Sequence, residues 1–158
     1  MKVWLAESSL DFTTYIVADK GDRLGVFKMK MAGLFGNKIY DESGFYEQLS
    51  TDDKLLFVEK TSWLLEHLEG ERKRLDDIKI EQRAFDVPEW LLLDDWNEDN
   101  NFDLVVNTKT QSTFKFEYVE GKMLATFINA TDEQCLKAKS FLDKMRKRDD
   151  EWDENEYE

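Results

Sequence analysis

The chain has 158 residues, 41% of them hydrophobic, and a formal net charge of −13. No apolar run approaches the roughly 18 residues that a membrane-spanning helix needs, and the opening MKVWLAESSLDF is too short in apolar residues for a signal peptide. The single cysteine excludes a disulfide within the chain, so we expect a soluble, cytoplasmic protein of a reducing compartment. The chain has one proline and seven glycines, and no Gly/Ser- or Pro-rich linker separates two halves. This predicts a single α+β domain over residues 1–148.

The negative charge lies in two blocks. Residues 76–103 carry a net charge of −8 and residues 149–158 a net charge of −7, whereas the rest of the chain carries +2. Phosphate binding requires clustered Lys and Arg, so we expect neither nucleic acid nor an anionic membrane as a direct partner. A basic protein surface is the complementary partner. Residues 149–158 are too polar to bury apolar area, and we expect them to form an acidic, flexible tail.

The first third of the sequence predicts strands. Residues 2–6 and 13–18 are rich in β-branched and aromatic residues, and residues 19–22 (DKGD) are a turn signal. Over residues 27–31, Phe and Met alternate with Lys, which is typical of a strand with one polar face. We therefore expect an N-terminal β-hairpin or three-stranded meander, followed by a break over residues 32–36.

A central amphipathic helix is expected next. Ser50 can cap it, and Asp52 and Asp53 would lie in its first turn. Apolar residues recur at helical spacing and predict its buried stripe; these are Phe57, Leu64, Leu68 and Leu75, widened by Leu56, Thr61, Trp63 and Leu65. Trp4 and Trp63 are both expected in the core. Residues 71–82 continue as a charged helical stretch or a second short helix, but the sequence leaves helix and strand both open over residues 70–86. The residue before Pro88 indicates a boundary.

The last third predicts a three-stranded antiparallel meander followed by a helix. Apolar residues alternate with polar ones over residues 102–106 and 114–118, and residues 123–128 form the third strand. Thr131 and Gln134 match a capping box at the start of the helix. The basic residues 144–148 suit its C-terminal end.

Residues 94–103 (DDWNEDNNFD) raise the possibility of calcium binding. Asp95, Asn97 and Asp99 have the spacing that opens an EF-hand loop. Counted from Asp95, the sixth position is Asn100 where glycine is needed, and the twelfth is Val106 where glutamate is needed. A solvated acidic loop is the simpler interpretation, and we expect no metal site.

Few residues suggest catalysis. His67 is the only histidine and fits a surface or partly buried helix position, while Cys135 fits a buried structural cysteine. Zinc sites draw on several His and Cys residues, and no phosphate loop or dinucleotide fingerprint is present. We therefore expect no catalytic residues and no cofactor.

These patterns favour a non-catalytic inhibitor or interaction module whose acidic blocks bind a basic protein surface, such as the nucleic-acid-binding groove of a nuclease. Exposed Trp and Tyr are enriched in binding hot spots. The candidate partner-binding residues are Asp94, Asp95, Trp96, Glu98, Asp99, Asp103, Trp152, Asp153, Glu154 and Tyr157.

In size and charge the chain is similar to two groups of small proteins. One comprises phage-encoded inhibitors of bacterial defence, including anti-CRISPR proteins and DNA mimics, and the other comprises immunity proteins of nuclease toxins. Neither group has a shared motif on these residues. Two alternatives stay open: a small enzyme or calcium-binding module that uses the 94–103 loop, and an acidic structural subunit of a complex.

Overall fold

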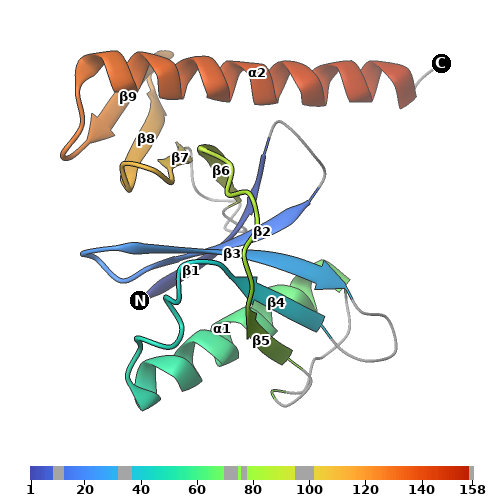
Figure 1. Cartoon of the computed structure of the whole chain (residues 1–158). Helices are drawn as coiled ribbons and strands as arrows, with labels where there is room; N and C mark the ends of the chain where they lie inside the picture. The colour runs from blue at the N-terminus through green and yellow to red at the C-terminus, as the bar shows by residue number, and fades with distance from the viewer. Residues whose placement is uncertain (9–12, 32–36, 70–74, 76–77, 95–101, 157–158) are drawn as a thin grey trace. The chain divides into compact units, whose positions relative to one another are not determined.

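The computed structural model describes residues 1–8, 13–31, 37–69, 75, 78–94 and 102–156. The chain divides into two compact units (Figure 1). Unit 1 holds Met1–Ala6 and Thr13–Val87, and unit 2 holds Glu7–Phe12 and Pro88–Glu158. Both units combine a mainly antiparallel sheet with one long helix, which confirms the predicted α+β class. The single domain over residues 1–148 and the flexible tail over 149–158 stay predictions.

The described part of unit 1 contains five strands in the order β5-β4-β3-β2-β1. Their bounds are β1 Lys2–Glu7, β2 Thr14–Asp19, β3 Leu24–Met31, β4 Asn37–Asp41 and β5 Ile78–Gln82. The succession of β1, β2 and β3 confirms the predicted N-terminal meander. β5 pairs with β4 in parallel, because the helix α1 (Thr51–Glu69) lies between them in sequence and carries the chain back to the same end of the sheet,.

Local hydrogen bonds set where α1 begins. The carboxylate of Asp41, at the end of β4, accepts hydrogen bonds from the backbone N–H groups of Phe45 and Tyr46, 3.3 and 2.9 Å away. The Oγ of Ser50 then accepts from the N–H of Asp53 at 3.2 Å, which confirms the predicted helix cap. Two acids in the first turn suit the helix dipole,.

α1 covers one face of the unit 1 sheet. Phe57 and Leu65 are fully buried, and Leu64 is nearly so. They pack on strand residues whose side chains share that face, including Ile16, Phe27 and Ile39, so the inward residues of three strands and one helix form a single apolar core.

Three apolar residues predicted to be buried are exposed, namely Trp63 (56%), Leu68 (41%) and Leu75 (53%). Trp63 lies about 120° around the helix from Phe57, outside the buried face. Leu68 shares that face but lies in the last turn of α1, beyond the core residues. Leu75 lies outside α1, so the helical spacing does not apply to it. Trp4 is half-buried rather than a core residue.

Residues 78–82 form strand β5 rather than a helix, which decides that part of the segment 70–86 in favour of a strand. Ile78 is buried and Ile80 is half-buried, while Lys79 is exposed. This period of two belongs to a strand, and pairing with β4 stabilises it. Residues 70–74 and 76–77 lie outside the described residues, as does the predicted break at 32–36.

In its described residues, unit 2 is an antiparallel sheet with the order β6-β7-β8-β9 and one helix. Its elements are β6 Trp90–Asp94, β7 Phe102–Asn107, β8 Ser112–Val119, β9 Lys122–Phe127 and α2 Asp132–Glu156. β7, β8 and β9 confirm the predicted meander, whereas β6 was not expected from the sequence. One face of α2 packs on the sheet through Ala138, Phe141, Leu142 and Met145.

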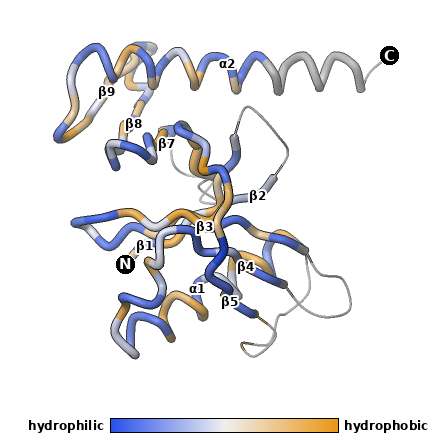
Figure 2. Tube along the Cα trace, in the orientation of Figure 1, coloured by the Kyte–Doolittle hydropathy of each residue, from blue (hydrophilic) through white to orange (hydrophobic). Residues whose placement is uncertain are grey.

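α2 begins as the sequence predicts and ends later. The N–H of Thr131 donates to Oε1 of Gln134 at 3.1 Å, and the N–H of Gln134 donates to Oγ1 of Thr131 at 3.2 Å, which completes the capping box,. The helix runs past the basic residues to Glu156, because no glycine or proline after Thr131 stops it,. The described part of α2 alternates between hydrophilic and hydrophobic residues (Figure 2). None of the described helices is long and apolar enough to cross a membrane.

Candidate functional site

The structure describes the side chain of only one predicted partner-binding residue, Asp103. Asp94 is the last residue of strand β6, and residues 152–154 lie in α2; for these four residues the structure describes only the backbone. Asp95, Trp96, Glu98, Asp99 and Tyr157 lie outside the described residues, and so does the calcium-loop spacing over 95–100. In the described part of the chain, no group of three or more His, Cys, Asp or Glu side chains could hold a metal ion.

Asp103 is already neutralised by a cation of its own unit. Its carboxylate pairs with the guanidinium of Arg146, which also donates to the hydroxyl of Tyr118 and lies 4.8 Å from the centre of that ring. Burial alone would lower the pKa of Arg146, but the hydrogen bond to Tyr118 and the charge of Asp103 raise it. The Asp103–Arg146 ion pair therefore links β7 to α2, and the charge of Asp103 is largely compensated by that of Arg146.

The two residues considered for catalysis occupy ordinary positions. His67 lies on α1 with its ring edge against Trp63, 4.3 Å between centroids. Cys135 is half-buried beside the unit 2 core. Burial raises the pKa of the Cys135 thiol, and the charge of Asp132 adds to the effect, so the thiol stays protonated at neutral pH.

The outer strand of unit 2 is unusually exposed. Every β9 residue from Lys122 to Thr126 is exposed, and β9 ends the sheet order, so no described strand pairs with its outer edge. Large apolar side chains on and beside the strand lie in solvent, namely Val119 (42%), Met123 (36%), Leu124 (55%) and Ile128 (76%). We call these four residues and the β9 backbone the β9 edge. An exposed apolar edge strand of this kind presents N–H and C=O groups with which a strand of another chain can pair.

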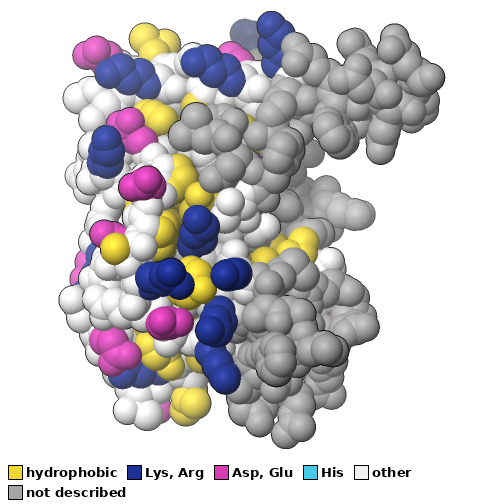
Figure 3. Space-filling view, turned by 45° about the vertical axis from the view of Figure 1, so that its right-hand side comes forward, with side chains coloured by type: hydrophobic (Ala, Val, Ile, Leu, Met, Phe, Trp, Pro, Cys, Tyr) yellow, Lys and Arg dark blue, Asp and Glu magenta, His cyan; other side chains and the backbone are white. Residues whose placement is uncertain are grey.

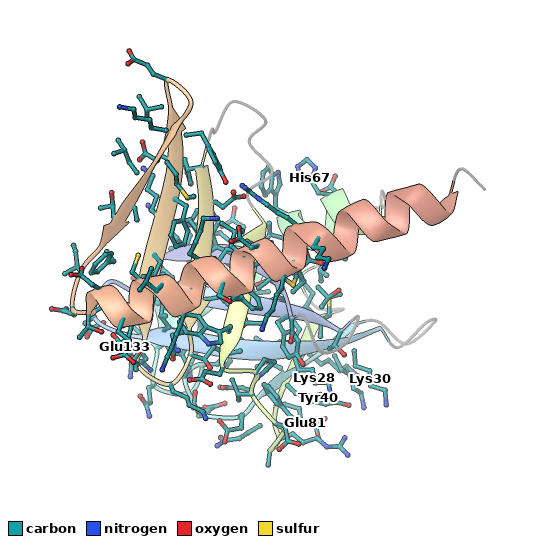
Figure 4. All side chains as sticks on the ribbon, turned by 90° about the horizontal axis from the view of Figure 1, so that it is seen from above. Lys28, Lys30, Tyr40, His67, Glu81 and Glu133 are labelled. Atoms are coloured by element: carbon teal, nitrogen blue, oxygen red, sulfur yellow. The ribbon has the colours of Figure 1, made fainter. Side chains whose placement is uncertain are left out.

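Acidic residues flank the β9 edge. Glu120 lies in the turn before β9, and Asp132 and Glu133 begin α2 just after it; all three are exposed. Glu133 is labelled at the start of the helix in Figure 4. Lys122 is the one basic residue of β9. The surroundings of this apolar strand are therefore net acidic, which favours a basic partner.

Unit 1 presents a basic surface on the sheet face opposite α1. Strand pairing places Lys30, Lys38 and Lys79 side by side on β3, β4 and β5. The neighbouring row is Lys28, Tyr40 and Glu81, and these side chains lie together in Figure 4. Figure 3 shows lysine and arginine side chains gathered close together on the face that it presents.

The aromatic ring on this basic surface is covered. Arg83 lies 5.1 Å from the centre of the Tyr40 ring and donates to its hydroxyl at 3.4 Å. Tyr40 is only 7% exposed, so the ring cannot serve as a stacking platform for nucleic-acid bases.

The described residues of each unit also line a hollow that contains lysine and tryptophan side chains. In unit 1 a cavity of about 280 Å³ lies between β1 and α1, beside Trp4, Lys60 and Trp63. The larger cavity, about 390 Å³, lies in unit 2 between β6 and α2.

Comparison with protein-family models finds no match, and comparisons with curated proteins and with solved structures find none either. The function is therefore inferred from the residues themselves.

Sequence reasoning missed the β9 edge and the unit 2 cavity. Met123 and Leu124 are adjacent apolar residues in a strand, so one of them must face away from the core; this signal could have indicated an exposed residue. Lys137, Ser140, Phe141 and Lys144 recur at helical spacing, which could have indicated one mixed face of α2.

Proposed function

We propose that the chain is a non-catalytic acidic interaction protein that inhibits a partner by docking on its basic, nucleic-acid-binding surface. The observation that carries this proposal is the β9 edge: no described strand pairs with the outer side of β9, and Met123 and Leu124 are exposed there among acidic residues. Apolar residues ringed by polar ones are typical of binding hot spots. The charge of the acidic blocks would speed the encounter, and the apolar edge would slow dissociation.

The kind of partner follows from charge. A surface that binds nucleic acid carries clustered Lys and Arg, and such a surface complements the blocks at residues 76–103 and 149–158. The size and acidity of the chain fit an anti-CRISPR protein, a DNA mimic or a nuclease immunity protein. A nuclease or another nucleic-acid-binding enzyme is the expected target.

A capture experiment with matched baits tests the proposal. The immobilised chain is exposed to a nucleic-acid-free extract of the cells that produce it, beside Leu124→Glu, Leu55→Glu and Asp95→Lys with Asp99→Lys. Leu55 is exposed to a similar degree (64% against 55% for Leu124) but lies on α1 of unit 1. Circular dichroism verifies that each bait is folded.

We expect the wild type and Leu55→Glu to retain the same basic protein. Leu124→Glu and the double charge reversal should each lose most of it, and a high-salt wash should release it, because exposed charge pairs are screened within about 8 Å at physiological salt. Deletion of residues 149–158 should weaken retention only modestly. Equal retention by Leu124→Glu and the wild type would refute the β9 edge as the contact.

A further inference from the structure

The cavity of unit 2 combines cations, hydroxyl groups and aromatic rings. Its volume is about 390 Å³, within the roughly 300–1,000 Å³ that is usual for small-molecule sites. It is bounded on one side by the start of β6 and on the other by α2. Its lining residues are Ser8, Pro88, Glu89, Trp90, Lys137, Ser140, Phe141 and Lys144.

One face of α2 supplies the polar groups. Lys137, Ser140 and Lys144 are spaced three and four residues apart, so they project from the same side of the helix,. Ser140 thus lies between the two lysines, which are about 10 Å apart along the helix axis but have long, flexible side chains. All three residues are exposed, and their polar groups can converge on one anion above Ser140.

These two lysines differ from their neighbours on α2. Lys139 pairs with Asp143, and Arg146 pairs with Asp103. Among the residues that the structure describes, no ion pair involves Lys137 or Lys144. Glu89 is the only acid in the cavity lining, and its Oε1 accepts a hydrogen bond from Asn107 at 3.5 Å. The cavity therefore keeps a net positive charge.

Aromatic rings form the apolar wall. The rings of Trp90 and Phe141 are stacked, with centroids 6.3 Å apart and planes inclined by 24°. Trp90 is half-buried, so part of its ring borders the cavity. A planar ring can pack against this wall, since aromatic pairs prefer offset or tilted contacts at such distances.

We propose that this cavity binds a small aromatic anion. Its ring packs against Trp90, and its phosphate or carboxylate group lies at Ser140 between Lys137 and Lys144. Lysine binds such groups as a point charge, and the serine hydroxyl adds a directional donor. This site is separate from the β9 edge in sequence and in chemistry, so either can fail without the other.

Calorimetric titration of the full-length chain tests the site with defined probes. Adenosine 5′-phosphate and 1-naphthoate each combine a ring with an anionic group, one a phosphate and the other a carboxylate. Adenosine lacks the anion, and inorganic phosphate lacks the ring. At least one of the two aromatic anions should bind saturably, at least about tenfold more tightly than adenosine or phosphate, and more weakly as salt rises.

Matched variants locate the binding. Lys137→Met with Lys144→Met removes both cations, whereas Lys109→Met with Lys147→Met removes two exposed cations that do not line the cavity. Ser140→Asp places a carboxylate between the lysines, and Ser140→Asn is its neutral counterpart. We expect Lys137→Met with Lys144→Met, and Ser140→Asp, to weaken binding by about tenfold or more, and the control pair and Ser140→Asn to stay within about threefold of the wild type.

Two results would overturn the proposal. One is that neither aromatic anion binds more tightly than inorganic phosphate. The other is binding that Lys137→Met with Lys144→Met leaves unchanged while circular dichroism shows a folded chain. If only one of the two probes binds with the expected variant pattern, the proposal stands and the result identifies the anionic group.

Discussion

Gly25 and Phe45 illustrate how single residues fix the core of unit 1. A Cβ atom on Gly25 would overlap the ring of Phe45. Phe45 is 3% exposed and packs edge-on against Phe27 at 5.9 Å. The missing side chain of the glycine therefore makes room for an aromatic ring over strand β3, which is a common use of glycine within strands.

We predict that Gly25→Ala destabilises the protein by roughly 1–3 kcal/mol, the usual range for overpacking a core. Urea unfolding measures the change. Gly21→Ala is the comparison for backbone strain without overpacking. Gly21 has a positive φ of 100°, but no atom lies within 4 Å of the added methyl group. If Gly25→Ala proved no less stable than the wild type, the packing of Phe45 on this glycine would be wrong.

The residues that sequence reasoning placed correctly act locally. Ser50 and Thr131 form hydrogen bonds with residues three positions further along the chain, and such short spacings can be recognised in a sequence. Asp103 finds Arg146 at a separation of 43 residues, which no local pattern reveals. For this reason the ion pair between Asp103 and Arg146 could not be predicted from the sequence.

At the scale of elements, substitutions in α1 show which of its leucines contribute to the core. We predict that Leu64→Ala costs roughly 2–5 kcal/mol because it leaves a cavity beside Phe57,. Leu68 is 41% exposed, so Leu68→Ala should cost less than about 1 kcal/mol. Chemical denaturation of both variants gives the comparison. Equal losses would mean that the buried face of α1 extends through its last turn.

The lysine row on β3, β4 and β5 makes a second prediction. Lys38 lies between Lys30 and Lys79, and like charges directly opposite each other destabilise a sheet. Lys38→Gln should therefore stabilise the protein, by about 0.2–1 kcal/mol at low salt. The gain should shrink as salt screens the repulsion.

Thermal melts at two salt concentrations measure this effect, with Lys109→Gln as the control on an exposed turn of unit 2. A destabilised Lys38→Gln, or a gain that is the same at both salt concentrations, would show that the three lysines do not repel one another in the folded sheet.

Strands with a long alternating pattern could be predicted from the sequence, whereas a short strand that depends on pairing with a distant strand could not. β3 and β8 alternate clearly between apolar and polar residues. β5 also alternates, but over only five residues, and its strand conformation depends on the parallel pairing with β4 across the whole of α1. The same pairing creates the row of lysines, so the basic surface of unit 1 could not be inferred from a chain that is acidic overall.

At the scale of the whole molecule, opposite charges occupy separate places. The sequence gathers 17 of its 35 acids in two blocks, whereas the described sheet face of unit 1 is basic and the surroundings of the β9 edge are acidic and apolar. Composition alone predicted an acidic protein that binds another protein, and this stays a prediction. It could not identify the β9 edge, because a strand's position at an edge follows from the strand order of the sheet, which composition does not reveal.

The most direct test of the account is competition on the captured partner. Purified partner is mixed with labelled nucleic acid, and the chain is added over a range of concentrations at low and at physiological salt. We predict that the wild type and Leu55→Glu displace the nucleic acid, that Leu124→Glu needs at least about tenfold more protein to do so, and that displacement weakens as salt rises. A partner that holds the chain and the nucleic acid at the same time, with no loss of either, would contradict the account.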